Sequence, residues 1–210
     1  QVPRLVLFNA GAVVVMAGVV SASPPAVVAG GATVALVAVW HAVALWRRMR
    51  AALPSRFRLT VRYYVAAGAC LPVGAVFGVL LTRNLGAAYE RVVLVHALVN
   101  ILGWIGLTVI GTLVTLWPTM LRTRIADRAE LASRRMLPVL IGGLLLAAAA
   151  ALWGNPLLTA AGLLLYLGGF LAVAAPHLEE VRRKAPVDFS TGSTLAAVGW
   201  FAGSLLLMAA

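Results

Sequence analysis

The residues of this sequence best suited to chemistry are histidines, and one of them lies inside an unusual apolar stretch. His96 stands near the start of the run VHALVNILGWIGLTVIGTLVTLWPTMLRTR at 95–124, and Asn100 follows one helical turn later, so the two side chains share a helix face. Gly103 extends that face and leaves room for a bulky planar group, on whose edge Trp104 is placed to stack. The spacing indicates a cofactor site, with plain helix-to-helix hydrogen bonding by His96 and Asn100 as the alternative.

A second histidine lies close to the other end of a predicted membrane span. His41, in AVWHAVALWRRMR, falls between Trp40 and Trp46 just before an arginine cluster, which resembles an aromatic belt at a membrane surface. It either bonds to a neighbouring helix or serves as a ligand or redox group. Because His41 and His96 lie near opposite membrane faces, they are poorly placed to hold one haem iron together. A haem at His96 would therefore be five-coordinate or take a second ligand from outside these 210 residues, unless no haem binds.

The remaining ionisable residues fall near the ends of the apolar runs. His177, in AAPHLEEVRR, is expected to cap a helix at the interface, where water can reach it. The acids are all predicted to lie in loops: Glu90, Asp127, Glu130, Glu179, Glu180 and Asp188. Proton and cation carriers usually place carboxylates at membrane depth, so this pattern argues against an ordinary carboxylate-based transporter.

These residues are positioned by an exceptionally apolar chain. Of its 210 residues, 62% are hydrophobic and 11% are charged, whereas charged residues make up about a quarter of an average globular domain. Apolar runs long enough to cross a bilayer recur seven times. The predicted helices are 5–22, 26–46, 63–82, 92–121, 136–153, 157–175 and 193–210. We therefore predict an all-α, polytopic integral membrane helix bundle that forms a single domain over 1–210.

The net charge of +11 comes from arginines that flank the apolar runs, which favours anionic lipid headgroups as partners over nucleic acid. Three basic segments, at 47–62, 122–135 and 182–184, alternate with loops that carry only Arg83 and Arg91. By the positive-inside rule the basic segments are cytoplasmic, which puts the amino end inside and the carboxyl end on the extracytoplasmic face.

Small residues and a lone thiol complete the pattern. Glycines spaced for close helix packing occur in most of the runs: Gly74, Gly78, Gly103, Gly106, Gly111, Gly162, Gly168, Gly169, Gly199 and Gly203. Thr108, Thr115 and Thr119 continue the stripe below Trp104, either packing against a helix or lining a wet path. Cys70 is the single cysteine, which excludes a disulfide framework within the chain.

Two stretches, HALVNILGWIGLTVIGTLVTLWPTMLRT and the earlier HAVALWRRMRAALPSRFRLTVRYYVAAGACLPVGAVFGVLL, carry a family resemblance. They resemble the membrane domain that actinobacterial multicopper oxidases and copper nitrite reductase-like proteins carry ahead of their cupredoxin domains. That domain is distantly similar to haem-copper oxidase subunit I and to the NnrS haem proteins. The resemblance covers most of the chain, and its most specific part is the block from His96 to Arg122.

The resemblance implies a plasma-membrane domain that anchors an extracytoplasmic copper enzyme and passes electrons to it through a b-type haem, with quinol as a candidate donor. His96 is then the metal ligand, and Asn100, Trp104 and His41 are the other candidate cofactor-binding residues. Copper would bind only in domains outside this chain, so the fragment itself is not expected to be catalytic. The sequence begins at Gln1 and ends within an apolar run, which is typical of a fragment of a longer protein. The alternative is a haem-free helical scaffold, sensor or assembly module.

Overall fold

The computed structural model describes residues 2–51, 58–120, 127–183 and 188–210, and within these ranges the chain is helical without strands. The elements are α1 (Val2–Val20), α2 (Pro24–Ala51), α3 (Arg58–Leu80), a short 3-10 turn (Gly86–Ala88), α4 (Tyr89–Leu98), the π-helix η2 (Val99–Gly106), α5 (Leu107–Met120), α6 (Asp127–Trp153), α7 (Pro156–Arg183) and α8 (Phe189–Ala209). The all-α prediction is confirmed.

Seven of these helical segments are long and apolar enough to cross a membrane, as predicted. The fourth of them, Gly86–Met120, joins the 3-10 turn, α4, η2 and α5 into 35 continuous residues. The helices are longer than predicted at several ends. Five of the six acids consequently lie in the end turns of α4, α6 and α7, so the prediction that all acids lie in loops was wrong for Glu90, Asp127, Glu130, Glu179 and Glu180.

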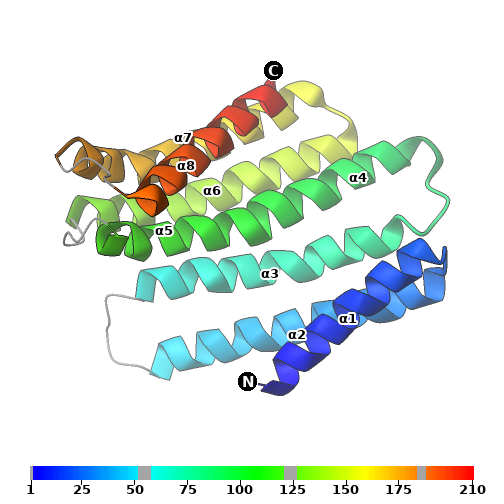
Figure 1. Cartoon of the computed structure of the whole chain (residues 1–210). Helices are drawn as coiled ribbons and strands as arrows, with labels where there is room; N and C mark the ends of the chain where they lie inside the picture. The colour runs from blue at the N-terminus through cyan, green and yellow to red at the C-terminus, as the bar shows by residue number, and fades with distance from the viewer. Residues whose placement is uncertain (1, 52–57, 121–126, 184–187) are drawn as a thin grey trace.

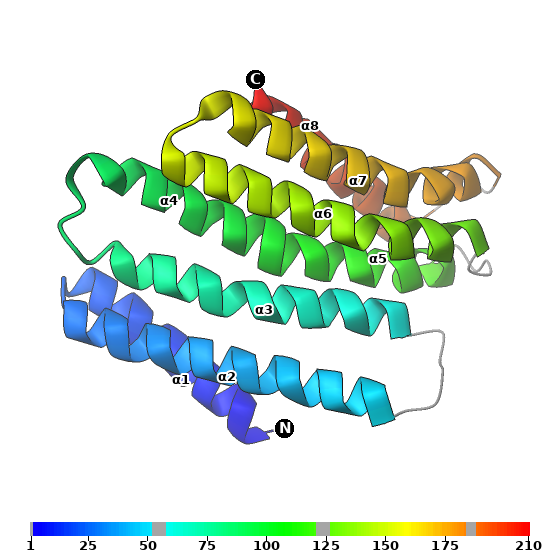
Figure 2. The same ribbon diagram turned by 180° about the vertical axis from the view of Figure 1, so that it is seen from behind.

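The helices run roughly along one direction, with α3 in the middle (Figure 1). On one side of α3 lies the hairpin of α1 and α2, and on the other lie α4, η2 and α5, followed by α6, α7 and α8 (Figure 2). The turns at 21–23, 81–88 and 154–155 meet at one end of the bundle (Figure 1). The ends of α2, α5 and α7 lie at the opposite end, together with Arg47, Arg48 and Arg50 of α2.

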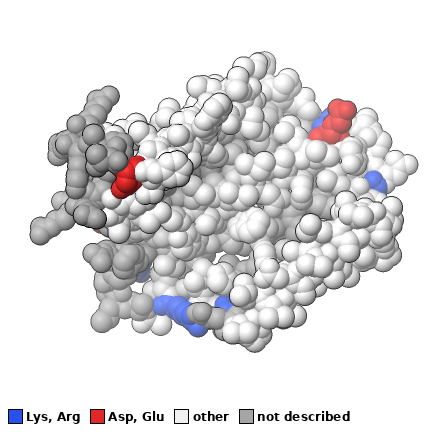
Figure 3. All heavy atoms as spheres, in the orientation of Figure 1, with Lys and Arg blue, Asp and Glu red and all other residues white. Residues whose placement is uncertain are grey.

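On the face shown in Figure 3, charged side chains lie near the two ends and along the lower edge, and the broad centre of that face carries none. Large apolar side chains are exposed along the middle of the helices: Leu36 is 71% exposed, Leu145 63% and Trp200 78%. In water such a surface would be costly, at roughly 25 cal/mol for each Å² of apolar area. The molecule therefore presents an apolar girdle between two polar ends.

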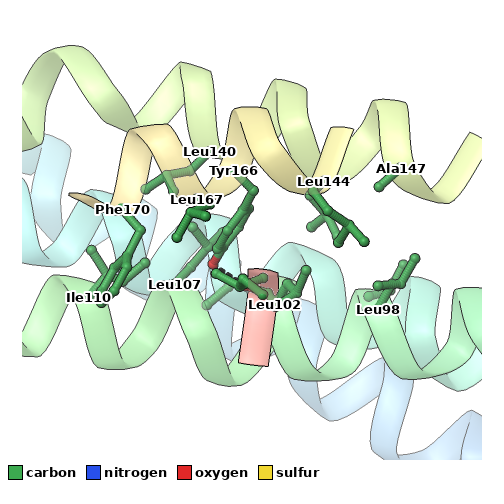
Figure 4. Close-up of a cluster of buried hydrophobic side chains, with 14 of the residues drawn as sticks. Leu98, Leu102, Leu107, Ile110, Leu140, Leu144, Ala147, Tyr166, Leu167 and Phe170 are labelled. Carbon is green, nitrogen blue, oxygen red and sulfur yellow. Dashed lines mark hydrogen bonds between the residues drawn. The ribbon is translucent and has the colours of Figure 1, made fainter. Parts of the chain in front are cut away.

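The interior is a cluster of side chains from α3, the continuous α4, η2 and α5 segment, α6, α7 and α8, part of which is drawn in Figure 4. Tyr63, Leu107, Leu140, Ala147 and Tyr166 are fully buried there. Both buried tyrosines bond across helices, because an unpaired hydroxyl in an apolar interior is costly. Tyr63 donates to the carbonyl oxygen of Ser133 at 2.8 Å, and Tyr166 donates to that of Leu102, also at 2.8 Å.

Close backbone approach explains some of the predicted glycine stripes and not others. A Cβ at Gly143 would lie 2.7 Å from the backbone nitrogen of Tyr166, and one at Gly162 would collide with the backbone of Ala147, so α6 and α7 pack backbone to backbone. Gly168, Gly199 and Gly203 are different, since a Cβ there would meet nothing within 4 Å. The packing role predicted for these three was wrong within the described residues.

Candidate functional site

His96, Asn100 and Trp104 lie on one long helical segment where the α-helix changes to a π-helix. His96 belongs to the last turn of α4, and Asn100 and Trp104 belong to η2. At the change, the N–H of Val99 reaches the carbonyl oxygens of both His96 and Val95. A π-helix is rare and is often found at functional sites, because its wider turn alters the direction of the side chains it carries. The sequence pattern did not reveal it.

Glycines let neighbouring helices pack closely against the π-helix. A Cβ at Gly103 would lie 2.8 Å from Sγ of Cys70 on α3, and a Cβ at Gly106 would lie 2.7 Å from the hydroxyl of Tyr166 on α7. That hydroxyl bonds to the carbonyl oxygen of Leu102 inside η2 (Figure 4). The π-helix is thus supported from two sides, by a thiol and by a hydrogen-bonded phenol.

The imidazole of His96 is oriented by the backbone of another helix. Its Nδ1 lies 2.8 Å from the carbonyl oxygen of Gly74 on α3. A carbonyl oxygen only accepts, so Nδ1 carries the proton and Nε2 keeps its lone pair. Within the part of the chain that the structure describes, Nε2 makes no hydrogen bond. Fixing one ring nitrogen by a backbone carbonyl is the usual way in which proteins orient a metal-binding histidine.

Asn100 contributes its amide to the same site. Its Nδ2 donates to the backbone oxygen of His96 at 2.7 Å. The same nitrogen lies 3.4 Å from Nδ1 of His96, but both atoms carry hydrogens, so this approach is a contact and not a bond. With Nδ2 engaged, the amide is fixed in one orientation and its Oδ1 remains available as an acceptor.

Two glycines of α3 provide the space that these side chains occupy. A Cβ at Gly74 would lie 2.5 Å from both Nδ2 and Oδ1 of Asn100. A Cβ at Gly78 would lie 2.9 Å from Cε1 of His96 and 3.8 Å from its Nε2. From the sequence, Gly74 and Gly78 were predicted to serve helix packing. In the structure, the missing side chain of Gly74 leaves room for the amide of Asn100, and that of Gly78 leaves room for the imidazole of His96.

His96 and Asn100 line a cavity of about 700 Å³ between the α1–α2 hairpin and the α3, α4 and η2 segment. Ligand pockets typically measure about 300–1,000 Å³. Its walls are mostly apolar and include Val15, Val27 and Leu71. Polar groups gather towards the turn end of the bundle, where the lining includes Ser23, Thr82 and Tyr89.

No protein-family model, curated protein or solved structure matches this chain. The resemblance to copper-enzyme membrane domains therefore stays a prediction.

His41 lies beside a different cavity. This second cavity, of about 560 Å³, is lined by His41 and Arg4 and by apolar residues of α1, α2 and α3. The neighbour of His41, Ala42, lies against Gly68, whereas His96 lies against Gly78. Ten residues of helix separate these two glycines by about 15 Å. The structure thus keeps the two histidines apart.

The two cavities share a wall of three residues, Phe8, Leu71 and Trp104. The rings of Phe8 and Trp104 face each other at a centroid distance of 6.2 Å and an interplanar angle of 58°. Trp104 was predicted to pack against a planar cofactor on one side. The structure shows that it borders both cavities, which the sequence did not indicate because Phe8 is on the distant helix α1.

Two other predicted features differ in the structure. His177 was expected at a water-accessible surface, but it is 6% exposed and lies in the interior, where its carbonyl oxygen accepts from Nε1 of Trp117 at 3.3 Å.

The hydroxyls of Thr108 and Thr119 bond to carbonyl oxygens of their own helical segment at 2.7 and 2.9 Å. They are therefore satisfied locally, and the wet-path alternative gains no support. Among the described residues no three His, Cys, Asp or Glu side chains form a metal cluster.

Proposed function

We propose that this chain is a membrane domain that binds a b-type haem at His96. The apolar girdle and seven long apolar helices support insertion into a bilayer. The arginines at the ends of α2 and α3 support a cytoplasmic location for that end of the bundle, by the positive-inside rule. The cavity beside His96 then opens towards the extracytoplasmic half of the membrane.

The residues present fit a haem. The observation that carries the proposal is the hydrogen bond from Nδ1 of His96 to the Gly74 carbonyl, which leaves Nε2 with a lone pair in the wall of a ligand-sized cavity. A single histidine is sufficient to hold haem iron in many proteins, and an apolar cavity suits the macrocycle. When bound, such a haem supplies one-electron exchange.

The chain's own residues divide the remaining tasks. The Gly74 carbonyl orients the imidazole of His96 and raises its basicity as a ligand. Oδ1 of Asn100 accepts a hydrogen bond from a molecule in the cavity. The hydroxyl of Ser23 at the turn end can donate to a carboxylate group at the polar edge of an amphiphilic ligand, and Trp104 closes the opposite side.

The larger role that the resemblance suggests is part of the proposal. The domain would anchor a cupredoxin-type oxidase or nitrite reductase on the extracytoplasmic side and deliver electrons to it. A haem near the extracytoplasmic face would be on the correct side for that delivery. In this proposal copper would be held by the exported domains.

The first experiment is a reduced-minus-oxidised visible spectrum of detergent-purified protein from a haem-replete host. We expect a b-type spectrum that His96→Ala abolishes and His41→Ala preserves. Carbon monoxide should shift the reduced spectrum when His96 is the only protein ligand, and no shift would indicate a second ligand such as Met16, which also lines the cavity. Featureless spectra for all three proteins would refute haem binding and favour the haem-free scaffold, whose supporting observation is the hydrogen bonding of His96 and Asn100 between and within helices.

Orientation is tested separately in a Cys70→Ala background. Asn84 lies in the turn between α3 and α4, and Arg48 lies at the opposite end of the bundle. A membrane-impermeant maleimide should label Asn84→Cys in intact cells and Arg48→Cys only after the membrane is opened. The reverse pattern would overturn the assigned sidedness.

A further inference from the structure

The cavity lined by His41 has the features of a second ligand site. It is lined by Val37, Ala38 and Gly68 among other apolar residues, and it is separated from the His96 cavity by Phe8 and Trp104. We propose that this cavity binds the head group of a lipid-soluble quinone. The inference extends the proposed function by assigning the haem a neighbour, but the binding itself does not require haem.

Two polar side chains that line the cavity, His41 and Arg4, can bond to the oxygens of a quinone ring. His41 is exposed and makes no hydrogen bond within the described part of the chain, although it lies in an apolar helix. An imidazole has one donor and one acceptor nitrogen, so it can bond either to a quinone carbonyl or to a quinol hydroxyl. Such a group in a predicted span is expected to have a functional partner.

Arg4 supplies a second donor at the same rim. Its guanidinium carbon lies 5.2 Å from the centre of the Trp40 ring, a cation–π arrangement that holds the side chain beside the cavity. Arg4 lines the cavity together with His41. A guanidinium only donates, so it complements a ring carbonyl and offers nothing to a plain acyl chain. This is why a quinone suits the site better than a lipid tail.

The position of the cavity also fits a quinone. It lies between α1, α2 and α3, where the hairpin joins the rest of the bundle, and Leu5 at its edge is 65% exposed. A ligand dissolved in the bilayer can therefore approach sideways. Once there, the ring would lie on one side of Trp104, whose other side borders the His96 cavity.

Quinone binding can be measured by tryptophan quenching in phosphatidylcholine nanodiscs, using decylubiquinone as the probe and protein freed of endogenous quinone. The wild-type protein should show a saturable component above the non-saturable quenching that follows partition into the bilayer. His41→Ala should weaken this component about tenfold, the usual scale for one lost hydrogen bond to a ligand. Leu5→Phe should weaken it as well by filling the edge of the cavity.

Two matched variants complete the design. Leu7→Phe makes the same change on the same helix outside the cavity lining, and His96→Ala alters only the other cavity; both should bind like the wild type. Equal affinity in all five proteins, quenching without saturation, or loss confined to His96→Ala would each overturn the proposal. If the protein shows a haem spectrum but no saturable quinone binding, only the quinone site at His41 is refuted. If quinone binding is saturable but no haem spectrum is seen, only haem binding at His96 is refuted.

Discussion

Replacing Gly74 by alanine tests the geometry of the candidate site without touching either side chain that forms it. The added Cβ would lie 2.5 Å from both amide atoms of Asn100, a distance that real Cβ contacts do not reach. The Asn100 amide is held by its 2.7 Å bond to the His96 backbone oxygen, so it cannot move without losing that bond. We therefore expect Gly74→Ala to destabilise the fold.

The magnitude follows from two opposing terms. Overpacking of an interior site lowers the free energy of unfolding by about 1–3 kcal/mol. Replacing a helical glycine by alanine raises it by about 1 kcal/mol, because alanine has the higher helix propensity. The expected net loss is up to about 2 kcal/mol in the free energy of unfolding, measured by a reversible detergent titration followed by circular dichroism. Gly142→Ala is the matched control, because a Cβ there would meet nothing within 4 Å, and it should leave stability unchanged or raise it.

The double variant separates a steric effect from a general loss of packing. Asn100→Ala alone removes a hydrogen bond and should cost about 1 kcal/mol. In the Gly74→Ala background the same change also removes the clash, so it should be neutral or stabilising, with a coupling of about 1–3 kcal/mol. If the two losses instead add to within about 0.5 kcal/mol, Gly74 and Asn100 do not compete for space and the described geometry is wrong.

Two further predictions concern the support of the site and the helix packing beside it. Tyr166→Phe should lower the free energy of unfolding by about 0.5–1.5 kcal/mol, because it removes the 2.8 Å hydrogen bond to the Leu102 carbonyl of η2, which then keeps only the backbone N–H of Leu107 as a donor; no loss in the same titration would contradict this. Gly162→Ala should be destabilising by about 1–3 kcal/mol, because its Cβ collides with the backbone of Ala147. Gly168→Ala, two turns along α7 and in open space, should be neutral or stabilising, and equal effects of the two alanines would show that α6 and α7 are not in close contact.

The periodic and compositional features of the chain were predictable because they are local. Seven long apolar segments follow from run length alone, and their number agrees with the structure. Helix ends were less predictable, as α6 begins at Asp127 and α7 continues to Arg183, beyond the apolar runs. Charged residues continue a helix past the apolar part when their side chains can reach a polar end. Hydropathy marks only the apolar part of a helix. Helices predicted from it are therefore too short where charged residues extend them.

The candidate site could be predicted only in part, for a physical reason. The spacing of His96 and Asn100 places them on one face, but it does not say what that face meets. The partner is the carbonyl of Gly74, a backbone atom that carries no sequence signal, and it lies on a helix 22 residues away. Non-local packing also decides that His41 and His96 belong to different cavities. The case for a ligand at His96 therefore rests on its fixed tautomer. A histidine that served only to join helices would need just the Nδ1 bond to Gly74 and no cavity beside it, whereas this imidazole keeps the lone pair of Nε2 and lines about 700 Å³ of ligand-sized space.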